Sequence, residues 1–262
     1  MNQSERTAIV LRCADYREHD RMLTLFSPTH GKIEALSRGC RRPKSHLLAG
    51  SQPFALGDFE LFRKAEHATV TGISLIETFY PIRTDFERLA AGTYLLNLCE
   101  LVIQPEEPRQ ELFMLLLHTL SRLAFSDQEW RPLLSGFYLH FAASEGFQPE
   151  LEHCVLCGKP VNGEENCCFD LREGGACCMA CHEEAILRES QMKLRPMPGQ
   201  SVTELQPVLV PQQLQWMKMA LQSGSAAWVN TPEQYAPYSL LRKYAELRLE
   251  QPVRAAKLLP AT

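Results

Sequence analysis

The sequence predicts an α+β multidomain protein, with a five-stranded OB-fold barrel at the N-terminus followed by an all-α domain. Residues 1–80 contain five runs of β-branched, aromatic and alternating residues, with little helical pattern between them. After residue 80 the apolar period becomes helical. Two C-x-x-C pairs interrupt the helical part and predict an inserted zinc-ribbon-like knuckle at residues 151–184. We therefore expect two domains, residues 1–80 and residues 81–262, the second of which carries the knuckle.

Composition is that of an ordinary globular protein, with 262 residues, 45% of them apolar and 22% charged. The net charge of −4 excludes a polycation, but residues 1–80 carry 11 Lys and Arg against 9 Asp and Glu, whereas residues 81–262 carry 16 against 22. The most apolar run, residues 112–125, is too short and too polar to span a membrane. Since the N-terminus also has no apolar signal core, we expect a cytoplasmic protein with reduced cysteines.

Five strands are predicted in the first domain, separated by turns rich in glycine and proline. Their ranges are 8–12, 22–27, 32–38, 54–63 and 68–77. This number of short strands suits a small Greek-key barrel such as the OB-fold, and an SH3-like barrel fits the count nearly as well. In the third strand, the two-residue period predicts that Ile33 and Ala35 face inward while Lys32, Glu34 and Arg38 face outward.

A basic loop, residues 37–48, follows the third strand and contains no acidic residue. Its four cations are Arg38, Arg41, Arg42 and Lys44, and Pro43 prevents the loop from continuing as regular strand or helix. A charge run is often only a solvated loop. Here the charge is uncompensated, and it lies where barrels of this type present loops to nucleic acid. Five aromatic rings nearby are candidates for base stacking: Tyr16, Phe26, Phe54, Phe59 and Phe62. Positions in the barrel core suit all of them better, and Tyr16 is the one least clearly assigned to the core.

Helices are predicted at residues 86–103, 111–125, 131–145, 211–221 and 238–250. The first is apolar on nearly every side and is expected to be buried. His118 lies on the polar stripe of the second, which predicts a surface position. Phosphate-binding glycine loops, nucleophile elbows and metalloprotease motifs are absent from the sequence.

Cys154, Cys157, Cys178 and Cys181 form the two C-x-x-C pairs, with twenty residues between the pairs. This spacing is typical of a four-cysteine zinc site. Two intervening residues let a tight turn direct both sulfurs at one ion, and four thiolates close a tetrahedron with metal–sulfur bonds of about 2.3 Å. A closed tetrahedron leaves no position for substrate, so we expect one structural Zn²⁺ per chain.

Alternative ligands remain open at this point. Seven of the ten cysteines lie between residues 154 and 181, and Cys167, Cys168 and Cys177 are spares, while His182 directly follows Cys181. Any of these four could replace a predicted ligand. The cysteines could instead be buried free thiols, which their density in this segment disfavours. They could also form disulfides, which the absence of a secretion signal disfavours.

Taken in order, the barrel, basic loop, helical block and knuckle make the chain resemble the RecO family of bacterial recombination mediators over essentially its whole length. The most specific segments are AIVLRCADYREHDRMLTLFSPTHGKI, LSRGCRRPKS, FALGDFELFR, CVLCGKP, FDLREGGACCMAC and LRKYAELRL. The resemblance implies an N-terminal OB-fold, a helical C-terminal domain and an inserted zinc motif, as the pattern of the sequence also does.

The resemblance further implies a function in DNA repair. Similar proteins bind ssDNA and dsDNA, anneal complementary strands, and act with RecR to load RecA onto ssDNA coated with single-strand-binding protein. It implies a cytoplasmic, nucleoid-associated protein without catalytic activity. The basic loop matches the DNA-binding region of the family, so Arg38, Arg41, Arg42 and Lys44 are expected DNA contacts. Weaker candidates are Lys32, Arg17 and Arg21.

Two rival interpretations come from other classes of protein. A structural adaptor whose zinc knuckle binds only proteins would agree with the acidic balance after residue 80, and it predicts no salt-sensitive DNA binding. A zinc hydrolase or deaminase would need a three-ligand metal and a glutamate base, for which Glu183 or Glu184 would serve. Four available cysteines argue against the latter.

Overall fold

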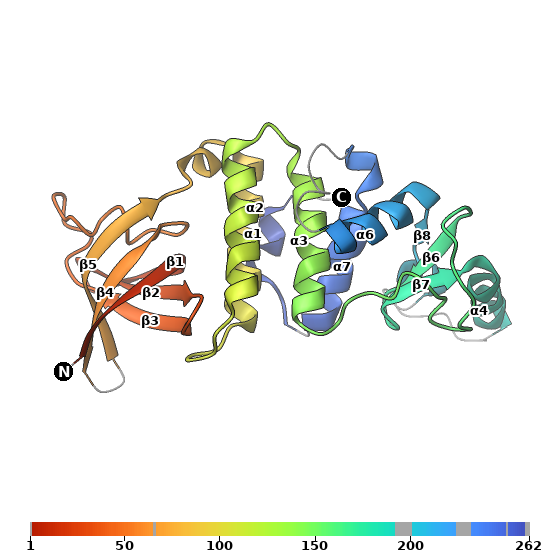
Figure 1. Cartoon of the computed structure of the whole chain (residues 1–262), viewed down its shortest axis with the longest axis horizontal. Coiled ribbons are helices and arrows are strands. Elements are labelled where there is room, and N and C mark those ends of the chain that lie inside the picture. Colours follow the sequence, from red (N-terminus) through yellow and green to blue (C-terminus); the bar gives the residue numbers. More distant parts are fainter. Residues whose placement is uncertain (1, 65–66, 192–200, 224–231, 250, 260–262) are drawn as a thin grey trace. The chain divides into compact units, whose positions relative to one another are not determined.

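The computed structural model describes residues 2–64, 67–191, 201–223, 232–249 and 251–259 (Figure 1). The chain divides into two compact units, Met1–Asp127 with Val253–Ala261 (unit 1) and Gln128–Pro252 (unit 2). Unit 1 therefore holds the five strands together with two helices from beyond residue 80. The domain boundary predicted at residue 80 stays a prediction.

A closed five-stranded barrel forms the N-terminal part of unit 1, with strand order β1-β2-β3-β5-β4 (Figure 1). Its strands are β1 Asn2–Tyr16, β2 Asp20–Ser27, β3 Gly31–Ser37, β4 Leu56–Lys64 and β5 His67–Glu77. Strand β1 pairs with both β2 and β4, while β3 pairs with β5 in parallel. This closed arrangement confirms the predicted OB-fold.

Strand β1 is much longer than the predicted range 8–12 because it pairs with two neighbouring strands. Its first half pairs with β4, from Asn2 opposite Arg63 to Ile9 opposite Leu56, and its second half pairs with β2 as far as Tyr16. The polar residues of the first half gave no apolar signal, and only the pairing with β4 makes them a strand.

The barrel interior is filled by the alternating apolar residues that the two-residue period predicts. Ile33 and Ala35 are buried, whereas Glu34 and Arg38 are exposed and Lys32 is partly buried. The buried cluster consists of Ala8, Val10, Leu23, Leu25, Ile33, Ala35, Cys40, Leu47, Ala55, Phe59, Leu61, Ala68 and Val70. Burial of this face fixes the strand register, because a slip of one residue would turn the apolar side chains to water.

Unit 1 continues with η1 Tyr80–Thr84, α1 Phe86–Val102 and α2 Gln110–Phe125, and it includes η4 Arg254–Leu258. Asp85 caps α1 by accepting a hydrogen bond from the backbone N–H of Arg88 at 2.9 Å. An ion pair of 2.6 Å joins Arg12 of β1 to Glu100 of α1. The helices of unit 1 are thus fastened to the barrel by a partly buried polar contact.

His118 of α2 is half-buried, which corrects the expectation that it lies on the surface. Burial, with a smaller contribution from the charge of Arg122, lowers the pKa of His118 below its ordinary value. The polar stripe of α2 is therefore partly covered, and His118 is expected to be neutral at pH 7.

The turn between β2 and β3 packs directly against the segment that joins α1 to α2. The backbone N–H of Lys32 donates to the carbonyl of Gln104 at 3.0 Å, and the N–H of Glu106 donates to the carbonyl of His30 at 2.9 Å. Gly31 lies between these bonds with a φ of 60°. Backbone meets backbone here, so there is no room for a side chain at residue 31.

Gly31→Ala is expected to destabilise unit 1 by about 3 kcal/mol or more. A Cβ at this position would lie 2.6 Å from the carbonyl oxygen of Glu107 and closer still to that of Gln104, and the positive φ itself costs about 1–2 kcal/mol for a residue with a Cβ. The matched control is Gly39→Ala, which shares the positive φ but would meet only the Arg42 side chain at 3.7 Å. Urea unfolding of both variants checks this, and equal losses would contradict the steric argument.

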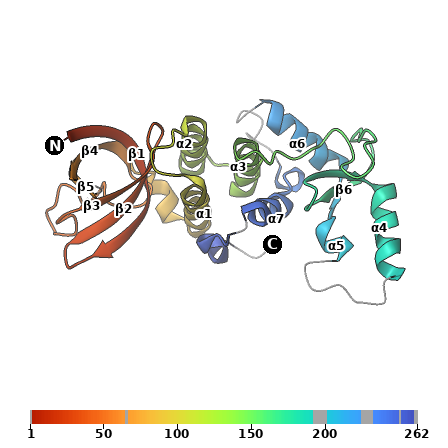
Figure 2. The same cartoon turned by 90° about the horizontal axis from the view of Figure 1, so that it is seen from below.

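Unit 2 consists of a small β-sheet and the helices around it (Figure 2). Its elements are α3 Trp130–Ser144, β6 Cys167–Asp170, β7 Gly175–Cys178, α4 Met179–Gln191, α5 Val202–Leu205, β8 Val208–Leu209, α6 Pro211–Ser223, η3 Glu233–Tyr235 and α7 Tyr238–Leu249. The sheet order is β7-β6-β8, with both pairs antiparallel. The sequence pattern predicted the inserted knuckle and helices α3, α6 and α7, but not α4, α5 or β8.

Aromatic side chains join the sheet of unit 2 to its helices. The ring of Phe169 on β6 lies 5.2 Å from that of Tyr244 on α7, edge to face, and Tyr244 lies 5.9 Å from Phe147. The hydroxyl of Tyr244 donates to the carbonyl of Phe147 at 2.7 Å. This packing gives the cysteine-bearing hairpin a rigid base.

Among the described residues, no helix is both long enough and apolar enough for a membrane crossing.

Candidate metal centre and nucleic-acid interface

Four cysteines of unit 2 converge as the C-x-x-C spacing predicts. The sulfurs of Cys154, Cys157, Cys178 and Cys181 all lie within 4.8 Å of one another, and such a group could hold a metal ion. Cys154 and Cys157 lie on a loop, Cys178 ends β7 and Cys181 lies in the first turn of α4. The two pairs come together because residues of the first loop bond to the hairpin.

Backbone hydrogen bonds shape the first pair into a knuckle. The N–H of Gly158 donates to the carbonyl of Cys154 at 2.8 Å, and Gly158 has a φ of 75°, which favours glycine. The N–H of Val155 donates to the carbonyl of Ala176 on β7 at 2.9 Å, which ties the knuckle to the second pair. The glycine that follows C-x-x-C in the sequence is thus required by the turn.

The donor set fits a tetrahedral ion such as Zn²⁺. Metal–sulfur bonds of about 2.3 Å in a tetrahedron place neighbouring sulfurs about 3.8 Å apart, and the sulfurs of Cys157 and Cys178 are 3.8 Å apart. The N–H of Cys178 also donates to the sulfur of Cys154 at 3.3 Å. Four thiolates and no carboxylate or imidazole make a soft, closed set, which favours a structural ion over a catalytic one.

The pKa of the Cys154 thiol sets this member of the four-cysteine cluster apart from the three spare cysteines. Burial opposes ionisation of Cys154, but the backbone N–H groups of Cys178, Leu156 and Cys157 overcome it and lower the pKa of the Cys154 thiol to about 6. Cys181 behaves differently, since burial and the neighbouring cysteines raise the pKa of its thiol. Four thiols at this spacing share their protons, so a cation is needed before all four ionise together.

The spare cysteines lie in apolar surroundings. Burial raises the pKa of the Cys167 thiol to about 11 and that of the Cys168 thiol to about 12, and it also raises the pKa of Cys177. Neutral thiols are poor metal ligands. Among the described residues, none of these three belongs to the group of converging sulfurs.

His182 is held away from the metal centre by a buried chain of polar side chains. Its Nδ1 lies 2.9 Å from the Oε1 of Gln206, whose Nε2 donates to Asp170 Oδ2 at 2.6 Å. Asp170 in turn accepts the N–H groups of Arg172 and Glu173 through its other oxygen. His182 thus supports the sheet that carries the cysteines rather than joining them.

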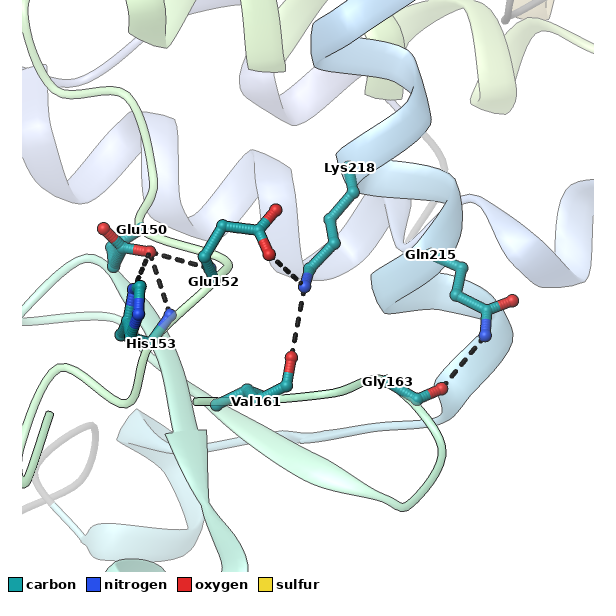
Figure 3. Close-up of polar contacts among 7 residues, drawn as sticks. All are labelled: Glu150, Glu152, His153, Val161, Gly163, Gln215 and Lys218. Atoms are coloured by element: carbon teal, nitrogen blue, oxygen red, sulfur yellow. Dashed lines mark hydrogen bonds and ion pairs between the residues drawn. The ribbon is translucent and has the colours of Figure 1, made fainter. Parts of the chain in front are cut away.

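Side chains of α6 hold the loop that precedes the hairpin (Figure 3). The ammonium group of Lys218 donates to Glu152 Oε2 at 2.7 Å and to the carbonyl of Val161 at 3.1 Å. One turn earlier, Gln215 donates to the carbonyl of Gly163 at 3.0 Å. These contacts bracket the first C-x-x-C pair, so α6 positions the knuckle from outside the cysteine cluster.

Glu150 caps the same loop (Figure 3). Its Oε1 accepts the N–H groups of Glu152 at 2.7 Å and His153 at 3.0 Å, and these two bonds lower the pKa of the Glu150 carboxyl. The carboxylate is therefore favoured at neutral pH and stabilises the turn that leads into Cys154.

Unit 1 carries the predicted basic loop at one rim of the barrel, after β3. Arg38, Arg41, Arg42 and Lys44 are all exposed. Within the described part of the chain, no ion pair involves Arg38, Arg42 or Lys44, whereas Arg41 pairs with Asp15 at 3.3 Å. The loop therefore presents positive charge to solvent, and of its four cations only Arg41 has a carboxylate partner among the described residues.

The turn between β1 and β2 is fastened to this basic loop. The N–H of Gly39 donates to Asp20 Oδ1 at 2.8 Å, and the N–H of Arg41 donates to the carbonyl of His19 at 3.0 Å. The two loops thus form one surface, which we call the basic rim: residues 15–21 and 38–44. Its six Lys and Arg residues exceed its three Asp and Glu residues.

Arg17 and Tyr16 form an exposed pair on the basic rim. The guanidinium carbon of Arg17 lies 5.2 Å from the centroid of the Tyr16 ring, and Tyr16 is 40% exposed. Phe26, Phe54 and Phe59 are buried, in keeping with the core positions preferred for them. Tyr16 is therefore the predicted stacking candidate that solvent can best reach.

Lys32 does not join the basic rim. It lies near the start of β3, and at about 3.3 Å per residue it is about 20 Å along the strand from Arg38. Its ammonium group is 3.4 Å from the carbonyl of Glu100 on α1. Its contact with DNA stays a prediction, as do those of the other six basic residues.

Asp15, His19 and Asp20 were missed because acidic and neutral residues carry no signal for an anion-binding surface. The polar run ADYREHDR indicated only a turn. Their role in shaping the basic rim follows from contacts between segments some twenty residues apart in the sequence.

Comparison with known proteins assigns both parts of the chain to one family. Residues 1–79 match the model described as "Recombination protein O N terminal", and residues 83–194 match "Recombination protein O C terminal".

Curated relatives agree with these family models. The chain is 34% identical to the DNA repair protein RecO of Acetivibrio thermocellus over 183 residues, which is 70% of this chain and 72% of the relative. It is 39% identical to the RecO of Alkaliphilus metalliredigens over 66% of this chain and 70% of that protein. For the RecO of Desulforamulus reducens the identity is 31%, over 96% of this chain and 92% of the relative.

Proposed function

The chain belongs to the RecO family, and from this premise we propose that it is a recombination mediator in DNA repair that binds ssDNA and dsDNA and anneals complementary strands. Its relatives are named as DNA repair proteins. The proposed activity is binding and positioning, without chemical catalysis.

The basic rim is the observation that carries this proposal. Arg38, Arg42 and Lys44 are exposed on a barrel whose fold binds oligonucleotides in other proteins. Lysine and arginine neutralise phosphates and release condensed counterions, which gives binding that tolerates any sequence. Tyr16 adds an exposed ring on which a base would stack.

Strand annealing follows from the same electrostatics. Two single strands repel each other through their phosphates, and a cationic surface that binds both lowers this repulsion. Base pairing then proceeds without nucleotide hydrolysis. The metal ion, which we propose to be Zn²⁺ on the four cysteines, would stabilise unit 2 and take no part in binding the phosphates.

The proposed partners are those of the family. We infer that the protein acts with RecR on ssDNA coated with single-strand-binding protein and thereby helps to load RecA. Such an activity belongs in the cytoplasm at the nucleoid, where these ligands meet.

Binding of a fluorescently labelled oligo-dT is expected to weaken steeply as salt rises. If the four loop cations Arg38, Arg41, Arg42 and Lys44 meet phosphates, log K should fall against log salt with a slope of about −3. Fluorescence anisotropy between 50 mM and 200 mM salt measures this slope. Absence of binding at low salt would refute autonomous DNA binding and favour an adaptor that binds only proteins.

A further inference from the structure

Asp15 at the end of β1 lies between two arginines of the basic rim. One carboxylate oxygen is 3.1 Å from Nε of Arg21, and the other is 3.3 Å from Nη1 of Arg41. Each guanidinium therefore has its own oxygen, and both converge on one anion.

The fold holds both arginines by contacts that do not involve Asp15. Arg21 donates through Nη1 to the carbonyl of Ser51 at 3.1 Å, and its side chain is only 22% exposed. The backbone of Arg41 is fixed by its bond to the carbonyl of His19. Without the carboxylate, Arg21 would therefore keep its bond to Ser51, and the backbone of Arg41 would keep its guanidinium within reach of the same position.

Asp15 itself is open to exchange with solvent ions. Its side chain is 55% exposed, and ion pairs at such positions contribute little to stability. An incoming anion with two oxygens of similar spacing would replace the carboxylate at small cost. A phosphodiester group has two such non-bridging oxygens, and guanidinium groups bind them with the same geometry as they bind carboxylates.

We propose that Arg21 and Arg41 form a phosphate site, that Asp15 occupies this site in the free protein, and that a nucleic-acid phosphate displaces it. The inference rests on the proposed DNA binding and adds a residue that opposes it. A carboxylate that competes with the phosphate shortens the time for which each strand stays bound. This suits a protein that must release the duplex it has formed.

Asp15→Asn is expected to tighten oligo-dT binding about three- to tenfold at 50 mM salt, because it removes one negative charge about 4 Å from the phosphate. The control is Glu18→Gln, which changes the net charge equally on the same turn. Glu18 is 87% exposed, and its Oε1 lies 3.7 Å from Nε2 of His19. Anisotropy titrations of the wild type and both variants measure the difference.

The outcomes separate this inference from the proposed function. Tighter binding by Asp15→Asn than by Glu18→Gln, with the gain abolished in an Arg41→Ala background, supports the phosphate site. Equal gains in oligo-dT affinity by the two variants would show that Asp15 acts only through its long-range charge. Weaker binding by Asp15→Asn would show that Asp15 positions the arginines. Either result overturns the inference while DNA binding stands. If the wild type does not bind, the proposed function fails and the inference with it. Should Asp15→Asn melt at a lower temperature than the wild type, Asp15→Ser makes the same comparison.

Discussion

Reversing the charge of Arg41, Arg42 and Lys44 together, as Arg41→Glu/Arg42→Glu/Lys44→Glu, is expected to weaken ssDNA binding by about two to three orders of magnitude at 50 mM salt. If each cation neutralises one phosphate, their loss reduces the salt slope from about −3 to about −0.7. All three side chains are exposed, and Arg42 and Lys44 form no ion pair with another described residue, so the substitution should leave the barrel folded. Anisotropy titration across a salt series measures both affinity and slope.

A matched control separates local contacts from total charge. The variant Lys159→Glu/Arg172→Glu/Arg188→Glu changes the net charge by the same amount at exposed positions of unit 2. It is expected to lose little affinity and to keep the wild-type slope, because these residues are not part of the basic rim and the slope counts the phosphates that are contacted rather than the total charge. Equal losses in the two triple variants would show that the basic rim is not the contact surface.

Removing the proposed metal ion is expected to unfold the cysteine-bearing part of unit 2 while the barrel stays folded. The hairpin strands β6 and β7 have four residues each, and α4 buries only His182 among its described side chains. Helix α4 therefore adds almost no apolar burial around the cluster, so the cluster depends on its ion even though Phe169 packs the hairpin against Tyr244. Structural zinc sites in small domains carry about 10–16 kcal/mol of binding free energy at pH 7.

Cys178→Ala and Cys167→Ala provide a matched pair for this experiment, since the two cysteines lie opposite each other on β7 and β6. Cys178→Ala should lose the bound metal and lower the melting temperature of unit 2. Cys167→Ala should keep one metal ion per chain and lose about 1–2 kcal/mol, as expected for a small buried side chain. Elemental analysis and calorimetry test both statements, and full metal content in Cys178→Ala would refute the ligand assignment.

Sequence patterns were sufficient to predict the strands and helices whose side chains are buried periodically. Ile33 and Ala35 are buried as alternation in β3 requires, and α1 and α2 begin and end within one residue of their predicted limits. Helix α4 was missed because its side chains are mostly exposed, so no apolar period marks it. The small strand β8 was missed because two residues have no period at all.

The candidate metal centre was predictable because the chemistry of its potential ligands is local. A C-x-x-C pair implies a knuckle wherever it lies, and the spacing of the pairs implies a common ion. The choice among seven nearby cysteines needed the fold, since only the register of β6 and β7 and the turn at Gly158 decide which sulfurs converge. The same register places Cys167, Cys168 and Cys177 in surroundings that keep them protonated.

By itself, the sequence determined the five-stranded barrel, the main helices, the two C-x-x-C pairs and the cationic loop, because apolar period, ligand spacing and local charge act over short stretches of chain. Only the tertiary structure decided that the β1–β2 turn and the basic loop form one surface, that Lys32 lies away from it, and that Asp15 meets Arg21 and Arg41. These relations depend on side chains brought together by strand pairing. The physical reason is that hydrogen bonds and ion pairs act over a few ångströms in space, whatever the separation of their residues along the chain.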